Sequence, residues 1–440
     1  MQHLKGEWTL TSSAEDFESQ VVNVYPEIEK QKILGFGGAF TEAAGYNYAQ
    51  LTEEQREQFM EACFGETGCR YRIGRVPMGS CDFSLTPYME ADKPDLSDFN
   101  IEHDKTYIIQ MVRDALKKAG DLFLFASPWS PPAFMKDNGT LNYAGKLLPE
   151  FYQTYAQYFV KFIEAYRAEG IRFSAVTVQN EARAKQTWES CLFTAEEEAI
   201  FATRHLRPAL DAAGLSDVKI LIWDHNRERI LDRARDSFAI PGAKEAIWGM
   251  GYHWYSGEHF DAMDEFCRLY PDKVLLETEF CNGGIASFDE EHRNVAYARE
   301  YIRSLKHGAA GLCDWNLMLD AEGGGPYHWR RGGCAAVFYH DARCDALVED
   351  GIYRAVKTVI SDIAVGDRVV ATTAAWGDLA HVAVKHADGT VTLILLNAGD
   401  QDRDLHVRMG KSGGTFTLPA HTVASVKVTE AFAGNGKDAV

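Results

Sequence analysis

Long apolar runs and clustered cysteines are both missing from this sequence. No stretch of its 440 residues approaches the about 20 apolar residues that a membrane-spanning helix needs, and residues 1–10 lack the apolar core of a secretory signal. The nine cysteines are scattered, with no CxxC pair and no Cys/His cluster of the kind that holds a structural metal. We therefore expect no integral membrane association, no bound metal, and reduced thiols in a cytoplasmic protein.

Positive charge is also in short supply. The chain has 45 Lys and Arg against 64 Asp and Glu, which gives a formal net charge of −19. Nucleic acids and anionic membranes are polyanions, so neither is expected as the main partner. Acidity serves solubility equally well, so the charge by itself assigns no function.

Short apolar runs alternate with helical segments from about residue 33 onward. The runs are continuous rather than alternating, as is typical of strands buried on both faces of a parallel sheet. Eight candidate strands lie at residues 33–36, 71–76, 122–126, 173–178, 218–223, 247–252, 273–278 and 311–316. Helical patterns lie between them, at about 103–118, 149–169, 260–270 and 290–307, and capping boxes at Thr52–Gln55 and Thr194–Glu197 begin two more.

Eight strands alternating with helices over about 320 residues predict a (β/α)8 TIM barrel. A doubly wound open sheet is the structural rival. It is disfavoured because the glycines at residues 35–38 lack the GxGxxG spacing of a phosphate-binding loop, which also disfavours a nucleotide-dependent enzyme.

The pattern of apolar and turn residues changes after about residue 366. Short strands at residues 382–384, 391–396, 405–407, 415–418 and 423–428 alternate with turn residues, which predicts a small antiparallel β-sandwich. An isolated strand at residues 21–24 is expected to join it. The predicted organisation is therefore residues 1–32 with the side sandwich, 33–365 as the barrel, and 366–440 as the rest of the sandwich.

Two glutamates stand where predicted strands end, at the edge where barrels carry their functional groups. Glu181 follows the fourth strand and Glu279 ends the seventh. Two facing carboxylates are what glycoside hydrolysis requires, one as acid and the other as nucleophile or base, and retaining enzymes hold them about 5–5.5 Å apart. Glu277 competes with Glu279, because alternation along a strand points the two side chains the same way. Glu279 lies nearer the rim.

Six motifs in order make the chain resemble glycoside hydrolase family 30, the glucosylceramidase-like enzymes. They are GFGGAFTEAA at 35–44, RVPMGSCDFS at 75–84, ASPWSPP at 126–132, NE at 180–181, TE at 278–279 and DWNL at 314–317. The resemblance implies a barrel with a side sandwich and a retaining double displacement. It places Glu181 on the family's acid/base and Glu279, rather than Glu277, on its nucleophile.

The resemblance also implies roles for the residues around the two glutamates. Arg75 and Tyr255 are expected to hold Glu279 ionised and oriented, although Arg75 could instead form a purely structural ion pair. Asn180 is expected to donate a hydrogen bond to the sugar 2-hydroxyl. His253 either contacts the acid/base or the sugar, or is a core histidine satisfied by backbone.

Aromatic and acidic side chains are expected to shape the sugar site. Trp129 and Trp315 either stack on a pyranose or only pack the barrel mouth. Glu42 stands where the family often has Asp to grip sugar hydroxyls, and Asp82 is either structural or ligand-binding. Residues 323–354 depart from the family pattern and carry the cluster His328-Trp329-Arg330-Arg331, which either binds the aglycone or folds over the barrel.

The sequence therefore predicts an exo-acting retaining β-glycosidase, a β-glucosidase or glucosylceramidase-like enzyme with a small β-glycoside as substrate. No metal or organic cofactor is expected, because two carboxylates supply the chemistry. A β-xylosidase, β-1,6-glucanase or β-fucosidase of the same family is the alternative, and a carbohydrate-binding protein without turnover is the rival outside enzymes. The sequence leaves the aglycone and the oligomeric state open.

Overall fold

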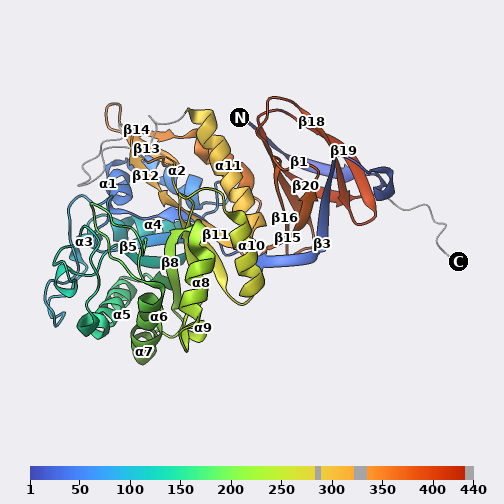
Figure 1. Cartoon of the computed structure of the whole chain (residues 1–440). Coiled ribbons are helices and arrows are strands. Elements are labelled where there is room, and N and C mark those ends of the chain that lie inside the picture. Colours follow the sequence, from blue (N-terminus) through green and yellow to red (C-terminus); the bar gives the residue numbers. More distant parts are fainter. Residues whose placement is uncertain (283–288, 322–333, 432–440) are drawn as a thin grey trace.

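Eight parallel strands close into a barrel, which confirms the predicted architecture (Figure 1). The computed structural model describes residues 1–282, 289–321 and 334–431. The barrel strands are β4 (Gly35–Ala39), β5 (Ile73–Met78), β6 (Phe123–Pro128), β7 (Ala175–Thr177), β8 (Lys219–Asn226), β9 (Gly249–His253), β10 (Val274–Glu279) and β11 (Ala309–Asn316). They follow one another in chain order around the barrel, and β11 pairs with β4 to close it.

The first and fourth barrel strands differ from their predicted bounds. β4 begins two residues later than predicted, because the backbone N–H of Ile33 donates to Asp367 at the junction with the side sheet. At its other end, β4 continues to Ala39. β7 is only three residues long, although Val178 still donates to Leu221 of the neighbouring strand.

Helices cover the outside of the barrel, as predicted. They are α1 (Glu42–Gln50), α2 (Glu53–Phe64), α3 (Glu102–Lys105), α4 (Ile108–Ala119), α5 (Tyr152–Ala168), α6 (Ala195–Phe201), α7 (Arg207–Ala212), α8 (Ile230–Phe238), α9 (Ala243–Ala246), α10 (Phe260–Leu269), α11 (Glu290–Lys306) and α12 (Gly351–Ile360). Both predicted capping boxes are present, at Thr52 with Gln55 and at Thr194 with Glu197. In the described part of the chain, no helix combines the length and apolar character that a bilayer crossing requires.

A nine-stranded sheet stands beside the barrel and contains strands from both ends of the chain (Figure 1). Its order is β1 (Gln2–Leu10), β20 (Thr422–Glu430), β17 (Val391–Asn397), β16 (Ala380–Lys385), β15 (Arg368–Ala374), β3 (Val21–Lys32), β18 (Arg403–Met409), β19 (Ser412–Leu418) and β2 (Ser12–Ser13). Because β1 and β20 also contact β19, the sheet folds over on itself and encloses its own apolar core, as a sandwich does.

The N-terminus contributes more to this sheet than predicted. The expected strand at residues 21–24 is part of the longer β3, and β1 and β2 are additional N-terminal strands; β15, which follows α12, was not predicted either. Most neighbours are antiparallel, as predicted, but β1 runs parallel to β20 and β3 runs parallel to β18. In β1, Leu4, Trp8 and Leu10 face the core of the sheet, but Gly6 interrupts this series and most of the strand is exposed, which is why the pattern did not reveal that strand.

Helices α11 and α12 lie between the barrel and the side sheet (Figure 1). α11 contacts β15, β16 and β17, and α12 contacts β1 and β20. A small third sheet of β12 (Met318–Asp320), β13 (Phe338–Asp341) and β14 (Ala346–Glu349) follows the last barrel strand. The predicted cluster at residues 328–331 lies outside the described residues.

Candidate active site

A cavity of about 400 Å³ opens at the carboxyl ends of the barrel strands. It contains both predicted carboxylates, and its lining residues are Asp82, Trp129, Asn180, Glu181, Gln186, Trp188, His225, Asn226, Tyr255, Glu279, Cys281, Trp315 and Cys334. A larger cavity of about 630 Å³ lies at the opposite end of the barrel, where β4, β10 and β11 begin. Functional groups of such barrels gather at the carboxyl ends, so the smaller cavity is the candidate site.

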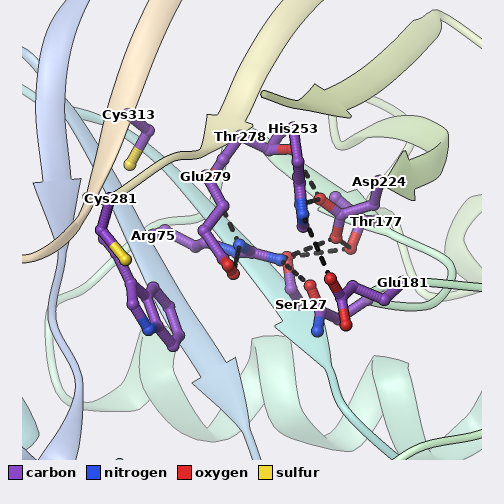
Figure 2. Close-up of polar contacts among 12 residues, drawn as sticks. Arg75, Ser127, Thr177, Glu181, Asp224, His253, Thr278, Glu279, Cys281 and Cys313 are labelled. Atoms are coloured by element: carbon purple, nitrogen blue, oxygen red, sulfur yellow. Dashed lines mark hydrogen bonds and ion pairs between the residues drawn. The ribbon is translucent and has the colours of Figure 1, made fainter. Parts of the chain in front are cut away.

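Arg75 on β5 organises the floor of this cavity (Figure 2). Its side chain is fully buried, and its guanidinium donates to Glu279 Oε2, Asn180 Oδ1 and Asp224 Oδ2, each at 2.8 Å. Nε donates to Ser127 Oγ at 3.1 Å. A buried guanidinium keeps its charge and its fixed fork of donors, so it holds these partners in one geometry. The predicted contact of Arg75 with Glu279 is present.

Glu279 ends β10 and receives a second hydrogen bond from Tyr255. The Tyr255 hydroxyl donates to Glu279 Oε1 at 2.9 Å, as predicted, so each carboxylate oxygen has its own donor. Glu279 is 7% exposed and faces the cavity. A carboxylate fixed in this way presents a defined lone pair to a bound ligand.

Glu277 points away from Glu279, so the prediction that both face the same way is wrong. The pairing of β10 with β9 shifts register between these two residues, as it does at a β-bulge, and regular alternation is lost there. Glu277 is buried against the helices, 3.7 Å from Arg227 and within hydrogen-bond distance of the Tyr252 hydroxyl. It takes no part in the cavity.

Glu181 lies at the end of the segment that follows β7. Its backbone has φ +49°, in the left-handed region that a non-glycine residue adopts only when its surroundings enforce it. The backbone N–H of Glu181 donates to Asp224 O at 2.8 Å, and Asp224 itself has φ +45°. These constraints turn the Glu181 side chain into the cavity.

Three polar side chains surround the Glu181 carboxylate. Gln186 Nε2 donates to Oε2 at 3.0 Å, while Nδ1 of His225 and Nδ1 of His253 lie 3.7 and 3.8 Å from Oε1. His253 Nε2 faces the carboxylate of Asp224 at 3.1 Å, so this histidine is held by a side chain rather than by backbone. The predicted proximity of His253 to Glu181 is present.

Asp224 is a site residue that the sequence analysis missed. It lies near the end of β8 and accepts hydrogen bonds from Thr177 at 2.7 Å and from Thr278 at 2.6 Å, in addition to its ion pair with Arg75 (Figure 2). Burial raises its pKa, but the Arg75 charge and the His253 hydrogen bond lower it by more, so it is ionised. Asp224 directly follows a predicted strand, so the rule that identified Glu181 would also have found it.

Burial and charge act against each other on the pKa values of the facing groups. Burial raises the pKa of Glu279, and the charges of His253 and Arg75 oppose that rise. Burial also raises the pKa of Glu181, but the nearby His253 and His225 lower it by more, to about 2. Burial lowers the pKa of His253, whereas Glu279, Asp224 and Glu181 together raise it to about 9. Glu181 is thus ionised beside a protonated His253.

Trp129 and Trp315 pack against each other at one wall of the cavity. Their rings are stacked with centroids 5.1 Å apart, and each residue is only 2% exposed. The Arg75 guanidinium lies over the Trp129 ring at 4.6 Å. Both residues pack at the barrel mouth and also line the cavity, and their stacking on a pyranose stays a prediction.

Glu42 lies away from the lining of the cavity. One carboxylate oxygen accepts from the backbone N–H of Leu85 at 2.8 Å, and the other lies 2.7 Å from His103 Nε2. Asp82, in contrast, borders the cavity. Of these two acidic residues, therefore, only Asp82 borders the cavity.

The sequence analysis also missed Gln186, His225 and the thiols of Cys281 and Cys334. The two sulfur atoms lie 3.1 Å apart at the edge of the cavity. Gln186 and Cys334 lie in loops without a periodic pattern, and their place depends on how those loops return to the barrel. His225 follows Asp224 and shares the same signal, a polar residue after an apolar strand.

Comparisons with known proteins agree with this architecture. Residues 33–354 match the glycosyl hydrolase family 30 TIM-barrel domain, and residues 367–426 match the family 30 beta sandwich domain. The chain is 34% identical over 412 residues to the lysosomal acid glucosylceramidase of Mus musculus, covering 88% of this chain and 79% of that protein.

Two solved structures are similar over nearly the whole chain. SrfJ from Salmonella typhimurium is 33% identical, with a TM-score of 0.90 and coverage of 93% of both chains. A structure described as an endo-β1,6-glucanase is 28% identical, with a TM-score of 0.83 and coverage of 92% of this chain and 93% of that one.

Proposed function

Because the chain belongs to glycosyl hydrolase family 30, a family of retaining glycoside hydrolases, we propose that it removes β-linked glucose from small glucosides, glucosylceramide-like lipids included. One observation carries the proposal. Two carboxylates with different partners face a single small cavity, Glu279 bound by Arg75 and Tyr255 and Glu181 beside two histidines.

In the proposed mechanism, Glu279 attacks the anomeric carbon while Glu181 protonates the departing oxygen. Glu181 then takes a proton from water, which releases the sugar from the glycosyl-enzyme. Asn180 Oδ1 accepts from Arg75, which leaves the Asn180 NH₂ group as the donor for the sugar 2-hydroxyl. Two carboxylates and a positioned sugar supply this chemistry without a cofactor.

The division of roles rests on the partners of each carboxylate. The pKa of Glu279 is shifted upward and that of Glu181 downward, so the pKa directions do not by themselves assign the two roles. Arg75 does not lose its proton in a protein, so its bond to Glu279 persists through the reaction. The histidine beside Glu181 does exchange its proton, and the two groups titrate as one unit that can deliver that proton to Glu181.

Glucose is the proposed sugar because of the relatives and the size of the cavity. The relative in Mus musculus is named a glucosylceramidase. A volume of about 400 Å³ is near the lower end of the ~300–1,000 Å³ of ligand pockets, which suits one sugar unit better than a long glucan. A β-1,6-glucanase is the second candidate, favoured by the similarity to the solved endo-β1,6-glucanase.

Covalent labelling tests the nucleophile. A 2-deoxy-2-fluoro-β-glucosyl inactivator traps the glycosyl-enzyme, and peptide mapping then identifies the modified residue. We expect the label on Glu279. The control variant Glu277→Gln changes the buried glutamate on the same strand, and it should still be labelled on Glu279. A label on Glu181 or Glu277 would overturn the assignment.

Azide rescue tests the acid/base. Glu181→Ala removes the proton donor, so substrates with poor leaving groups should lose most turnover, roughly 10²–10⁴-fold, while activated aryl glucosides are affected less. Azide should restore activity and give the β-glucosyl azide, because it attacks from the face that Glu181 vacates. Formation of the α-azide would assign the nucleophile role to Glu181 instead.

A substrate panel tests the sugar and the linkage. The 4-nitrophenyl β-glucoside, β-xyloside and β-fucoside separate the sugars, and gentiobiose, a β-1,6-glucan and glucosylceramide separate the aglycones. We expect the highest kcat/KM among the aryl glycosides on the glucoside, and turnover of glucosylceramide. A preference for the long β-1,6-glucan would favour the second candidate.

A further inference from the structure

Three ligand atoms meet at the Glu181 carboxylate in an arrangement that suits a metal ion. They come from three neighbouring barrel strands, with Glu181 after β7, His225 on β8 and His253 on β9. One oxygen of Glu181 and one ring nitrogen of each histidine all lie within 4.8 Å of one another. Residues so far apart in sequence show no metal-binding spacing, so no sequence pattern indicates this cluster.

Both histidines turn an unpartnered ring nitrogen into the cluster. Nδ1 of His225 and Nδ1 of His253 are buried and have no hydrogen-bond partner, and His253 is 0% exposed. Buried polar atoms normally have hydrogen-bond partners, but these two nitrogens face one carboxylate oxygen at 3.7 and 3.8 Å, which is beyond hydrogen-bond distance.

The spacing of these atoms suits a tetrahedral zinc ion. Zinc binds imidazole nitrogen and carboxylate oxygen at about 2.0–2.2 Å, which puts neighbouring ligand atoms of a tetrahedron about 3.4 Å apart. The observed distances of 3.7 and 3.8 Å from Glu181 Oε1 to the two histidines exceed that by a few tenths of an ångström, within reach of side-chain rotation. Two histidines and one glutamate form a known zinc ligand set with an open fourth position.

A supporting shell for such an ion is already in place. Asp224 Oδ1 lies 3.1 Å from His253 Nε2, which holds that nitrogen protonated and leaves Nδ1 as the ring nitrogen that faces the cluster (Figure 2). A carboxylate behind a histidine is the usual support of a zinc ligand. Asp224 is itself fixed by Arg75, Thr177 and Thr278.

We propose that Glu181, His225 and His253 form a binding site for Zn²⁺ or a similar divalent transition-metal ion, and that its occupation reversibly inhibits the enzyme. The ion takes the place of the proton at Nδ1 of His253 and engages the Glu181 oxygen, so Glu181 can neither donate nor accept a proton. The fourth position of the ion points into the cavity. The binding claim stands on geometry alone, whereas the inhibition rests on the proposed acid/base role of Glu181.

Binding is measured without substrate, on the metal-depleted full chain. Titration calorimetry with zinc chloride should give one ion per chain, and Co²⁺ should give visible absorption bands of a nitrogen and oxygen site. The absence of heat and of cobalt bands would overturn the proposal. A sulfur-to-cobalt charge-transfer band would overturn it too, because it would place the ion on the thiols of Cys281 and Cys334.

Matched variants locate the ion. His225→Asn should weaken zinc binding at least about 10-fold, since even a residue that only supports a metal ligand is worth about 10–100-fold in affinity. His406→Asn, the same change on the outer sheet strand β18, and Cys334→Ser should leave the affinity unchanged. Unchanged affinity in His225→Asn, or loss of binding in Cys334→Ser, would contradict the site.

Inhibition is measured last, as the ratio of rates with and without zinc for each variant. We expect zinc to inhibit the wild type. In His225→Asn, the zinc concentration needed for inhibition should rise by the same factor as the zinc dissociation constant of that variant. If zinc binds at this site but leaves the rate unchanged, the binding claim holds, and the acid/base role of Glu181 is what fails. The calorimetric result is therefore independent of the proposed function.

Discussion

The two facing carboxylates differ in what holds them. Glu279 has a permanent cation and a hydroxyl donor, one on each oxygen, whereas Glu181 has an amide and two histidines. The first arrangement stabilises a carboxylate that keeps its charge until it forms a bond. The second allows a proton to come and go. The chemical asymmetry of a double displacement is thus present in the side chains around each glutamate.

Tyr255 gives a test of this asymmetry. Tyr255→Phe removes the 2.9 Å hydrogen bond to Glu279 Oε1 and leaves the ring in place. Hydrogen bonds to charged groups contribute about 1.5–3 kcal/mol, so we expect kcat/KM on an aryl β-glucoside to fall about 10- to 150-fold. The thermal midpoint should change little, because 42% of this residue is exposed.

The matched control is Tyr143→Phe, which removes a hydroxyl from a tyrosine that is 53% exposed and outside the cavity. Its rate should equal that of the wild type. An unchanged rate in Tyr255→Phe would mean that this hydroxyl does not support the reacting carboxylate.

Much of the site could be predicted because its residues follow a positional rule. Glu181, Asn180, His253, Glu279 and Trp315 all lie where an apolar strand ends, and the barrel brings those ends together. The rule cannot say which way a side chain turns. Glu42 follows the first strand equally well, yet it is engaged by Leu85 and His103 outside the cavity lining. Side-chain direction depends on loop contacts that leave no period in the sequence.

At the scale of the element, the end of β10 shows how one irregularity changes the outcome. Leu276 and Thr278 point into the barrel, so strict alternation would turn Glu279 toward the helices with Glu277. The register shift between Glu277 and Glu279 brings Glu279 inward instead. Bulges are frequent beside active sites, where they re-aim a side chain. A pattern of apolar residues cannot reveal a single extra residue in a ladder.

The segment after β5 gives a prediction about pH and stability. Glu90 lies there, buried beside Asp104 of α3 and the Tyr158 hydroxyl of α5. Burial, together with the Asp104 charge, raises the pKa of Glu90 to about 8, and burial raises that of Asp104 to about 6. Unfolded carboxyl groups titrate near ~4. Between the unfolded and folded pKa values, the Glu90 and Asp104 carboxyls are ionised in the unfolded chain but still protonated in the folded one.

The contribution of Glu90 and Asp104 to stability should therefore be full below about pH 4 and should be lost as the pH rises toward 8, because these groups bind more protons in the folded state than in the unfolded state. Glu90→Gln removes one of these groups, so we expect its unfolding free energy to fall less steeply between pH 5 and 8 than that of the wild type. Urea unfolding at several pH values measures this. Glu102→Gln, an exposed change on α3, is the control and should keep the wild-type slope, and an equal slope in Glu90→Gln would contradict the prediction.

At the scale of the whole molecule, the barrel and the side sheet share one apolar core. Ile394 on β17 belongs to a cluster continuous with the barrel core, along with Val382 and Leu396 of the same sheet. Leu393, the preceding residue, belongs to a separate cluster enclosed by the folded sheet. Neighbouring residues on one strand therefore serve two different cores. The contacts of α11 with β15, β16 and β17 lie on the shared side.

A shared core predicts that barrel and sheet unfold together. Ile394→Ala and Leu393→Ala each remove a fully buried side chain, at a cost of about 2–5 kcal/mol. If the sheet were an independent domain, Leu393→Ala would melt it first and leave the barrel active. Because the sheet covers apolar surface continuous with the barrel core, we expect both variants to lose ellipticity and glycosidase activity in one transition, several degrees below the wild type.

An active species after the sheet has melted would contradict this coupling. If activity is lost at the same temperature as the side sheet melts, the side sheet stabilises a catalytic cavity that it does not touch.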